Sequence, residues 1–194
     1  MPHPLLNQPA PIVSIQDASG DSFTIAPGKS GKPLVVFFYP ASGTYGCTRE
    51  ACQFRDAINS NDRFKRTGVQ VIGISGDAPG KQKKFVNEHN LGYPVLSDGA
   101  NEARKQYHVP KGIFGLTEGR VTFCINKDGI VEEVHDSVLN FSMHATAVDK
   151  WLEKIGASEP TPTTTAATPA PAPTTTAAAE PAAPAPEESK PATA

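Results

Sequence analysis

Residues 34–52 read LVVFFYPASGTYGCTREAC, and this stretch is the most informative part of the sequence for the fold class. Its first six residues, 34–39, are apolar or aromatic and too few for a typical helix, so they predict a strand buried on both faces. Pro40 ends the run, and a loop with two glycines leads into a helical pattern over about 47–58. A buried strand, a short loop and a helix in succession are typical of α/β proteins.

The same alternation extends over both flanks of this stretch. Asp17–Asp21 and Asn126–Gly129 are turn-rich segments between short apolar runs, and each predicts a hairpin. Gly156 is expected to end the last helix. The predicted strands cover 12–16, 22–25, 34–39, 69–75, 93–98, 121–125 and 130–134, and the further helices cover 81–89, about 101–107 and about 142–155. The pattern predicts a mixed α/β sheet flanked by helices, with a hairpin at its N-terminal end.

The C-terminal segment differs sharply in composition. In residues 158–194, 30 of the 37 residues are Ala, Thr or Pro, and none is a large apolar residue or a cysteine. Such a segment cannot bury enough apolar surface to offset the entropy of ordering it. We therefore expect one folded domain over 1–157, followed by a disordered tail over 158–194 that acts as a solvated spacer.

Charge and hydropathy exclude several function classes. The net charge is -2 and no basic run occurs, so electrostatic binding to nucleic acid is not expected. No apolar stretch approaches the ~18 to 20 residues that span a bilayer, and residues 1–17 lack the pattern of a signal or transit peptide. Three cysteines are too few for a secreted disulfide framework, which favours a cytoplasmic location, with the nucleus as the alternative.

Cys47 is the first candidate for chemistry. It follows a buried strand and a glycine-containing loop and opens the predicted helix, at the sheet edge where α/β folds place ligands. Unpaired backbone N–H groups and the positive end of the helix dipole favour the thiolate there, and the thiolate is the reactive form of cysteine. A small packed residue at a helix start is the alternative interpretation of Cys47.

Cys52 lies five residues further along the same helix. That spacing turns the two side chains ~140° apart and separates them by an axial rise of ~7.5 Å. A disulfide needs Cα atoms within ~7 Å, so the two thiols pair only if the first turns of the helix unwind. Taken alone, Cys52 is equally well explained as a buried, inert thiol.

No metal site is expected. The five histidines are scattered singly and form no ligand pattern with the cysteines. The cysteine spacing also differs from the C-x-x-C motif of thioredoxin-type reductases.

Three segments together resemble one enzyme family. Pro40-x-x-x-Thr44-x-x-Cys47 resembles the active-site signature of the peroxiredoxins. The stretch GCTREACQFRD over 46–56 resembles the peroxiredoxin Q branch, also called bacterioferritin comigratory protein, in the AhpC/TSA family. YPVLSD over 93–98 and RVTFCINKDG over 120–129 match the family pattern in the same order, and the resemblance covers roughly residues 8–155.

The resemblance implies a thioredoxin fold and a thiol-dependent peroxidase that reduces hydrogen peroxide and organic hydroperoxides. It implies Cys47 as the peroxidatic nucleophile, oxidised to a sulfenic acid, and Cys52 as the resolving thiol that captures it in an intramolecular disulfide. Thioredoxin or a similar dithiol then reduces the disulfide, as in atypical two-cysteine peroxidases. It further implies antioxidant defence and redox homeostasis, no metal or other cofactor, and a monomeric chain.

Four further residues match positions of the family motif. The resemblance implies that Thr44 hydrogen-bonds the peroxide, that Pro40 shapes and shields the pocket, that Arg120 faces the thiolate and that Glu50 holds this arginine. The alternatives are a solvated charge for Arg120, a strand-ending proline for Pro40 and a first-turn acid that complements the helix dipole for Glu50.

Cys124 departs from the family pattern, in which an aliphatic residue is common at this point of the strand. A small core residue is the simplest interpretation, and a second resolving thiol is the alternative. Two other functions stay open: a redox-sensing interaction protein switched by unwinding of the 47–52 helix, and a protein disulfide reductase.

Overall fold

The computed structural model describes residues 2–112, 115 and 117–158. The elements in chain order are β1 (Val13–Asp17), β2 (Ser22–Ile25), β3 (Leu34–Phe38), α1 (Tyr45–Ser60), α2 (Asp62–Thr67), β4 (Gln70–Ser75), α3 (Pro79–His89), β5 (Val95–Ser97), α4 (Glu102–Gln106), β6 (Lys111–Gly112), β7 (Thr117–Glu118), β8 (Val121–Ile125), β9 (Val131–Asp136) and α5 (Ser142–Ser158). Apart from Ser158, the tail expected over 158–194 lies outside the described residues.

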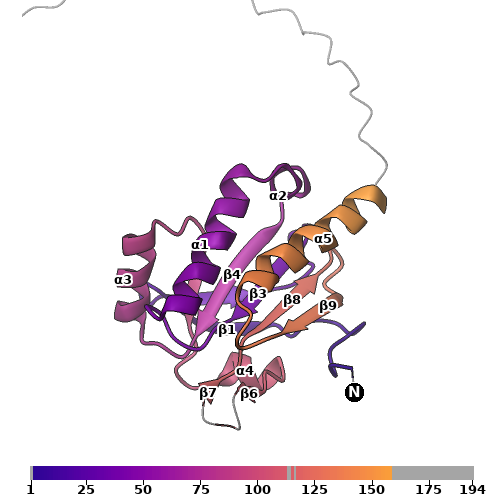
Figure 1. The fold of residues 1–194 in the computed structure, drawn as a ribbon. Helices are drawn as coiled ribbons and strands as arrows, with labels where there is room; N and C mark the ends of the chain where they lie inside the picture. Colours follow the sequence, from indigo (N-terminus) through magenta and orange to yellow (C-terminus); the bar gives the residue numbers. More distant parts are fainter. Residues whose placement is uncertain (1, 113–114, 116, 159–194) are drawn as a thin grey trace, which may run out of the picture. The chain divides into compact units, whose positions relative to one another are not determined.

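A seven-stranded mixed sheet forms the centre of the fold, in the order β2-β1-β5-β4-β3-β8-β9 (Figure 1). Strands β3, β4 and β5 run parallel, whereas β8 pairs antiparallel with β3 and β1 pairs antiparallel with β5. The hairpins β1–β2 and β8–β9 therefore extend the parallel centre at its two edges. The mixed sheet flanked by helices is thus confirmed, together with the N-terminal hairpin.

The core divides between the two faces of this sheet because successive side chains of a strand point to opposite sides. On one face, Val35 and Phe37 of β3 pack with Phe54 of α1, Phe85 of α3 and Trp151 of α5. The other face packs the alternate β3 residues against α4 and the N-terminal segment, through side chains that include Val36, Phe38, Ala103 and Tyr107. Every residue of β3 is buried, as its apolar run predicts.

Two features of the helices differ from the prediction. Helix α5 continues through Gly156 to Ser158, so the expected stop at Gly156 is wrong. A glycine lowers helix stability without ending a helix when its backbone keeps helical dihedrals, and Gly156 does not adopt a positive φ. Helix α2 was not expected from the sequence: the Asn61 side chain caps its start, and Gly68 in the left-handed conformation follows its end.

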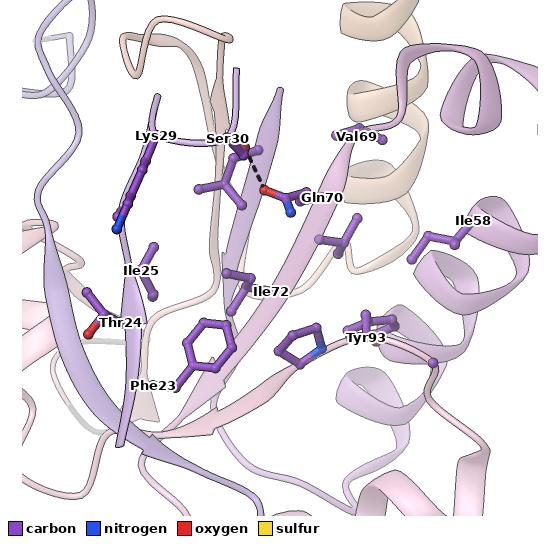
Figure 2. Close-up of a pocket in the computed structure, with 15 residues that line it drawn as sticks. Phe23, Thr24, Ile25, Lys29, Ser30, Ile58, Val69, Gln70, Ile72 and Tyr93 are labelled. Carbon is purple, nitrogen blue, oxygen red and sulfur yellow. Dashed lines mark hydrogen bonds between the residues drawn. The ribbon is translucent and has the colours of Figure 1, made fainter. Parts of the chain in front are cut away.

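One pocket, of about 450 Å³, lies beside β2, the start of β4 and the segment before β5 (Figure 2). Its walls include the apolar side chains of Phe23, Ile25 and Ile72, and a Ser30–Gln70 hydrogen bond of 3.0 Å crosses its polar end. None of the six residues to which the sequence assigns chemistry lines this pocket. The candidate site lies elsewhere, at the end of β3.

Candidate active site

Cys47 is the third residue of α1 and lies in its first turn. Thr44 caps this helix with an extended backbone and no side-chain cap bond, and its carbonyl accepts the first helical bond, from the N–H of Thr48 at 2.9 Å. The residue Cys47 is only 1% exposed. Its sulfur is therefore a largely desolvated group at the positive end of a helix dipole.

Arg120 reaches this sulfur from a distant part of the chain. Strand β8 pairs with β3 so that Val121 lies opposite Phe38, and this register brings the residue before β8 to the end of β3. The guanidinium Nη2 of Arg120 donates to Cys47 Sγ at 3.3 Å, and its Nε donates to the Val138 carbonyl at 3.1 Å. Because Arg120 is only 4% exposed, water does not screen this contact strongly, and the arginine is not a solvated surface charge.

Glu50 lies on the same side of α1 and binds the same guanidinium. Its Oε2 accepts from Arg120 Nη1, and both side chains are buried. Since α1 begins at Tyr45, Glu50 lies in the second turn, so the alternative of a first-turn acid that complements the dipole is wrong. Burial raises the pKa of Glu50 to about 8, against the opposite pull of Arg120.

Cys52 is half-buried on α1, and all three cysteines are free thiols. Helix α1 runs without interruption from Tyr45 to Ser60, so the ~7.5 Å rise between positions 47 and 52 applies to the reduced protein. The Tyr93 hydroxyl also donates to the Ala51 carbonyl at 2.9 Å, which ties the stretch between the two cysteines to the segment before β5. A bond between Cys47 and Cys52 requires this part of α1 to open.

Thr44 and Pro40 belong to the loop between β3 and α1. The Thr44 side chain is exposed and its Oγ1 donates to the Ala41 carbonyl at 3.1 Å, and Pro40 is half-buried. The structure therefore brings Arg120 into direct contact with both Cys47 and Glu50, while it places Thr44 and Pro40 on the loop that leads to the thiol.

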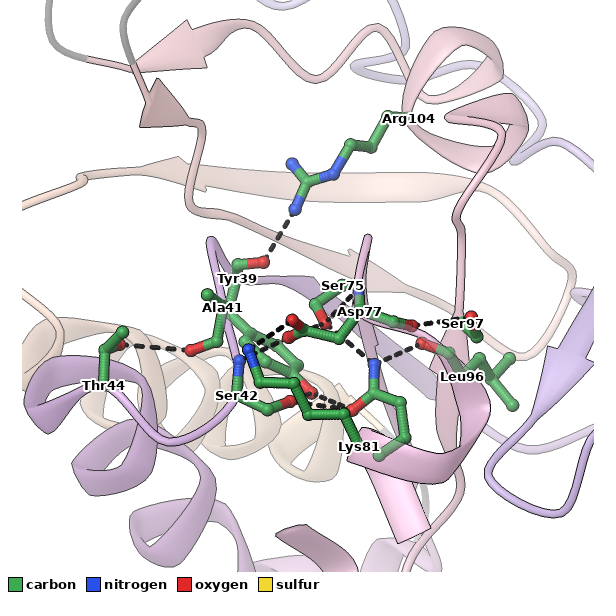
Figure 3. Close-up of polar contacts among 11 residues, drawn as sticks. Tyr39, Ala41, Ser42, Thr44, Ser75, Asp77, Lys81, Leu96, Ser97 and Arg104 are labelled. Carbon is green, nitrogen blue, oxygen red and sulfur yellow. Dashed lines mark hydrogen bonds and ion pairs between the residues drawn. The ribbon is translucent and has the colours of Figure 1, made fainter. Parts of the chain in front are cut away.

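A buried polar network anchors that loop (Figure 3), and it was not predicted from the sequence. The backbone N–H of Ser42 donates to Asp77 Oδ2 at 2.6 Å, and the hydroxyls of Tyr39 and Ser42 each donate to Gln82 Oε1 at 2.8 Å. On the other side, Arg104 Nη2 donates to the Tyr39 carbonyl at 2.7 Å. These contacts join the loop that precedes α1 to the turn after β4, to α3 and to α4.

Cys124 lies in β8 with its side chain on the face of the sheet that α1, α3 and α5 cover. It is fully buried, and burial raises the pKa of its thiol well above the usual range. A neutral, desolvated thiol is a poor nucleophile, so its surroundings are those of a small core residue.

Within residues 2–112, 115 and 117–158, no cluster of three or more His, Cys, Asp or Glu side chains is arranged to hold a metal ion. In the same part of the chain, no helix combines the length and the apolar character needed to cross a membrane.

The comparison with known proteins identifies the family of this chain. The family model described as "AhpC/TSA family" matches residues 6–134. The chain belongs to this family. Its similarity to a chloroplastic peroxiredoxin Q of Populus jackii is 38% identity over 148 residues, which is 76% of this chain and 68% of the relative. A chloroplastic peroxiredoxin Q of Gentiana triflora is 39% identical over 143 residues, covering 74% of this chain and 64% of the relative.

Solved peroxiredoxins share the fold. Peroxidoxin BcpB of Mycobacterium tuberculosis superposes with a TM-score of 0.69 at 32% identity, over 81% of this chain and all of that chain. A peroxiredoxin Q of Xanthomonas campestris superposes with a TM-score of 0.62 at 25% identity, over 76% of this chain and 92% of that chain. The AhpC/TSA protein described here is therefore a peroxiredoxin with the thioredoxin-like fold of the peroxiredoxin Q branch.

Proposed function

We propose that this chain is a thiol-dependent peroxidase in which Cys47 is the peroxidatic nucleophile. The observation that supports this most is the contact of 3.3 Å between Arg120 Nη2 and the buried Cys47 sulfur at the start of α1. A guanidinium is charged at every working pH, and its donors stabilise both the thiolate and the negative charge that develops on the leaving oxygen.

The first chemical step transfers two electrons to the peroxide. The Cys47 thiolate forms a bond to one peroxide oxygen while the O–O bond breaks, and the leaving oxygen takes a proton and departs as water or an alcohol. Cys47 becomes a sulfenic acid, the first stage of thiol oxidation. In this proposal the Thr44 hydroxyl turns from the Ala41 carbonyl to bind the peroxide, and Pro40 covers the bound substrate.

The second step forms a disulfide within α1. The Cys52 sulfur attacks the Cys47 sulfenic sulfur, the S–O bond breaks, and the hydroxyl group leaves as water after it takes a proton. The intact helix keeps the two thiols apart, so the first turns of α1 open before the bond forms. An external dithiol, which we propose to be thioredoxin, then reduces the disulfide by thiol–disulfide exchange and is itself oxidised.

The test is peroxide consumption coupled to thioredoxin, thioredoxin reductase and NADPH. We expect continuous NADPH oxidation with hydrogen peroxide or an alkyl hydroperoxide, and loss of this activity in Cys47→Ser. The variant Cys52→Ser should still form one sulfenic acid per chain without cycling through thioredoxin. Unchanged turnover in Cys47→Ser would refute the proposed chemistry, whereas normal cycling in Cys52→Ser would assign resolution to another thiol.

The opening of α1 also favours one alternative, a redox sensor whose oxidised helix changes the binding of a partner protein. Turnover distinguishes the two functions, because a sensor accumulates in the oxidised form while a peroxidase completes many cycles. An insulin reduction assay without peroxide addresses the disulfide reductase alternative, since a reductase would reduce insulin disulfides under those conditions.

The monomeric state and the cytoplasmic location belong to this proposal too. Light scattering of the reduced and the oxidised full-length chain measures the first. The plant relatives are named chloroplastic, so imaging of the tagged full-length chain has to distinguish cytoplasm, nucleus and organelle.

A further inference from the structure

A buried carboxylate oxygen next to the reactive thiol has no hydrogen-bond partner. Glu50 Oε2 binds Arg120, but Glu50 Oε1 is buried and makes no hydrogen bond in the structure. His144 Nδ1 of α5 lies 3.7 Å from this oxygen. Both side chains are completely buried, so water is not at hand to compensate the oxygen.

The hydrogen bonds of His144 define the tautomer of its neutral ring. Its Nε2 lies 3.0 Å from the Ser137 carbonyl, which can only accept, so Nε2 carries a hydrogen. Its Nδ1 lies 2.8 Å from Thr122 Oγ1. In a neutral imidazole Nδ1 is therefore an acceptor, and Thr122 is its donor. A neutral imidazole and an ionised carboxylate would then face each other with lone pairs only, and Glu50 Oε1 would have no donor.

A single added proton removes this conflict. If the carboxyl is protonated, its O–H can turn to His144 Nδ1, and if the imidazole is protonated, its Nδ1–H can turn to Glu50 Oε1. Either arrangement gives Glu50 Oε1 a partner once the 3.7 Å separation shortens to hydrogen-bond length, and His144 Nδ1 then exchanges its bond to Thr122 for the bond to Glu50. Without an added proton, Glu50 Oε1 has no hydrogen-bond donor. With two added protons, an imidazolium would lie beside Arg120 without a counter-ion.

The charge balance of the surrounding cluster also indicates one proton for the pair of Glu50 and His144. The Cys47 thiolate and the Arg120 guanidinium cancel, so the buried cluster is neutral only if Glu50 and His144 together carry one proton. The other titratable groups that face the cluster are Tyr93 before β5, Cys52 of α1, Arg104 of α4 and His135 of β9. The Tyr93 hydroxyl binds a helix carbonyl, and Arg104 binds backbone carbonyls and lies near Glu118. His135 is paired with Glu133.

We propose that Glu50 and His144 hold one proton between them while Cys47 is ionised, so that Arg120 remains the counter-ion of the thiolate. His144 is then a positioning residue, which acts on Cys47 through Glu50 and Arg120. The inference rests on the proposed peroxidase function, in which the thiolate form of Cys47 reacts.

The pKa shifts of the two groups agree with this geometry. Burial raises the pKa of Glu50 to about 8, and burial together with the charge of Arg120 lowers the pKa of His144 to about 4, against a hydrogen bond to Ser137 that raises it. Between these values the carboxyl is protonated and the imidazole is neutral, which is one proton for the pair. A carboxyl in its neutral form leaves the full charge of Arg120 to the sulfur.

The direct test is nuclear magnetic resonance of the reduced full-length protein at neutral pH, with carbon-13 in the Glu carboxyl groups and nitrogen-15 in the His rings. Glu50→Gln and His144→Phe assign the two signals. We expect either a protonated carboxyl with a neutral imidazole or a carboxylate with an imidazolium. A carboxylate with a neutral imidazole, or two protonated groups, overturns the inference. Peroxide consumption by the same sample is measured separately, so a failure of the proposed function is recognised as such.

A pH profile gives a second readout. In Cys52→Ser, the rate of Cys47 oxidation by peroxide should fall on the alkaline side, where the pair loses its proton and Glu50 takes up the charge of Arg120. Adding His144→Phe should move this fall to lower pH by about one unit, the size of one lost hydrogen bond. The control Thr122→Val should not move it to lower pH, because it removes only the competing donor to Nδ1. An identical alkaline limb with and without His144→Phe contradicts the positioning role.

Discussion

Removing the Tyr93 hydroxyl should speed disulfide formation between Cys47 and Cys52. This hydroxyl donates at 2.9 Å to the Ala51 carbonyl, between the two cysteines, and the Tyr93 ring also makes an edge contact with Phe37. The variant Tyr93→Phe keeps the ring and loses only the donor. Because the hydrogen bond exists in the closed helix and is lost when this part of α1 opens, its removal destabilises the closed form selectively.

The size of the effect follows from one hydrogen bond. A buried intramolecular hydrogen bond contributes a net ~0.5 to 1.5 kcal/mol, and about 1.4 kcal/mol corresponds to a factor of ten in an equilibrium constant. The open population of the sulfenic acid form should therefore rise about twofold to tenfold in Tyr93→Phe. Since opening precedes attack by Cys52, the rate of disulfide formation should rise by the same factor.

The assay is a single turnover with one equivalent of peroxide, acid quenching at short times and mass measurement of the disulfide. Tyr107→Phe is the matched control: the Tyr107 hydroxyl donates to the Pro11 carbonyl at 3.1 Å, and its side chain is completely buried on the opposite face of the sheet. Tyr107→Phe should lower the free energy of unfolding without speeding the disulfide step. Equal rates in the two variants and the unsubstituted protein would refute the selective role of the Tyr93 contact.

Three further predictions concern Arg120, Thr44 and Glu50. Arg120→Lys should slow Cys47 oxidation at least about tenfold in stopped-flow kinetics, because a lysine cannot present the planar fork that binds both the thiolate and Glu50; an unchanged rate would exclude that fork from catalysis. Thr44→Val should slow the same step while Thr44→Ser retains most of it, and equal losses in both would count against the hydroxyl. From about pH 6.5 to 8 the native Glu50 and His144 pair keeps a proton that the unfolded chain releases, so the free energy of unfolding should fall by about 2 kcal/mol as the pH rises through this window. Between pH ~4.5 and 6.5, Glu50 and His144 contribute to the pH dependence of the free energy of unfolding with opposite signs, and the two contributions cancel. Glu50→Gln should abolish the fall in denaturant titrations, and its persistence there would assign it to other groups.

Much of the fold could be predicted from local sequence because its elements are locally consistent. The apolar run 34–39 is buried throughout and contains strand β3 over Leu34–Phe38, and Asn126–Gly129 lies between β8 and β9 with Gly129 at a φ of 84°. Helix α2 was not predicted because it is only six residues long and has a single buried side chain, Phe64. The predicted stop at Gly156 failed because propensity for one residue is weak against the packing of a long helix.

Only part of the candidate site could be predicted from local sequence, because its other contacts depend on the tertiary structure. The position of Cys47 at a helix start follows from local pattern, whereas Arg120 was assigned through the family resemblance alone. Its approach to Cys47 depends on the antiparallel register of β8 against β3, which no local pattern records. The same holds for Asp77, which anchors the loop, and for His144, one of five histidines that the sequence shows only as scattered residues.

The most direct test of the account is to map the oxidised sulfur. The reduced protein is treated with one equivalent of hydrogen peroxide, alkylated and digested, and its cysteine peptides are identified by mass spectrometry. The account predicts a disulfide that joins Cys47 to Cys52, a trapped sulfenic acid on Cys47 in Cys52→Ser, and an unmodified Cys124. Peroxide-dependent oxidation that spares Cys47, or that is unchanged in extent in Cys47→Ser, would contradict it.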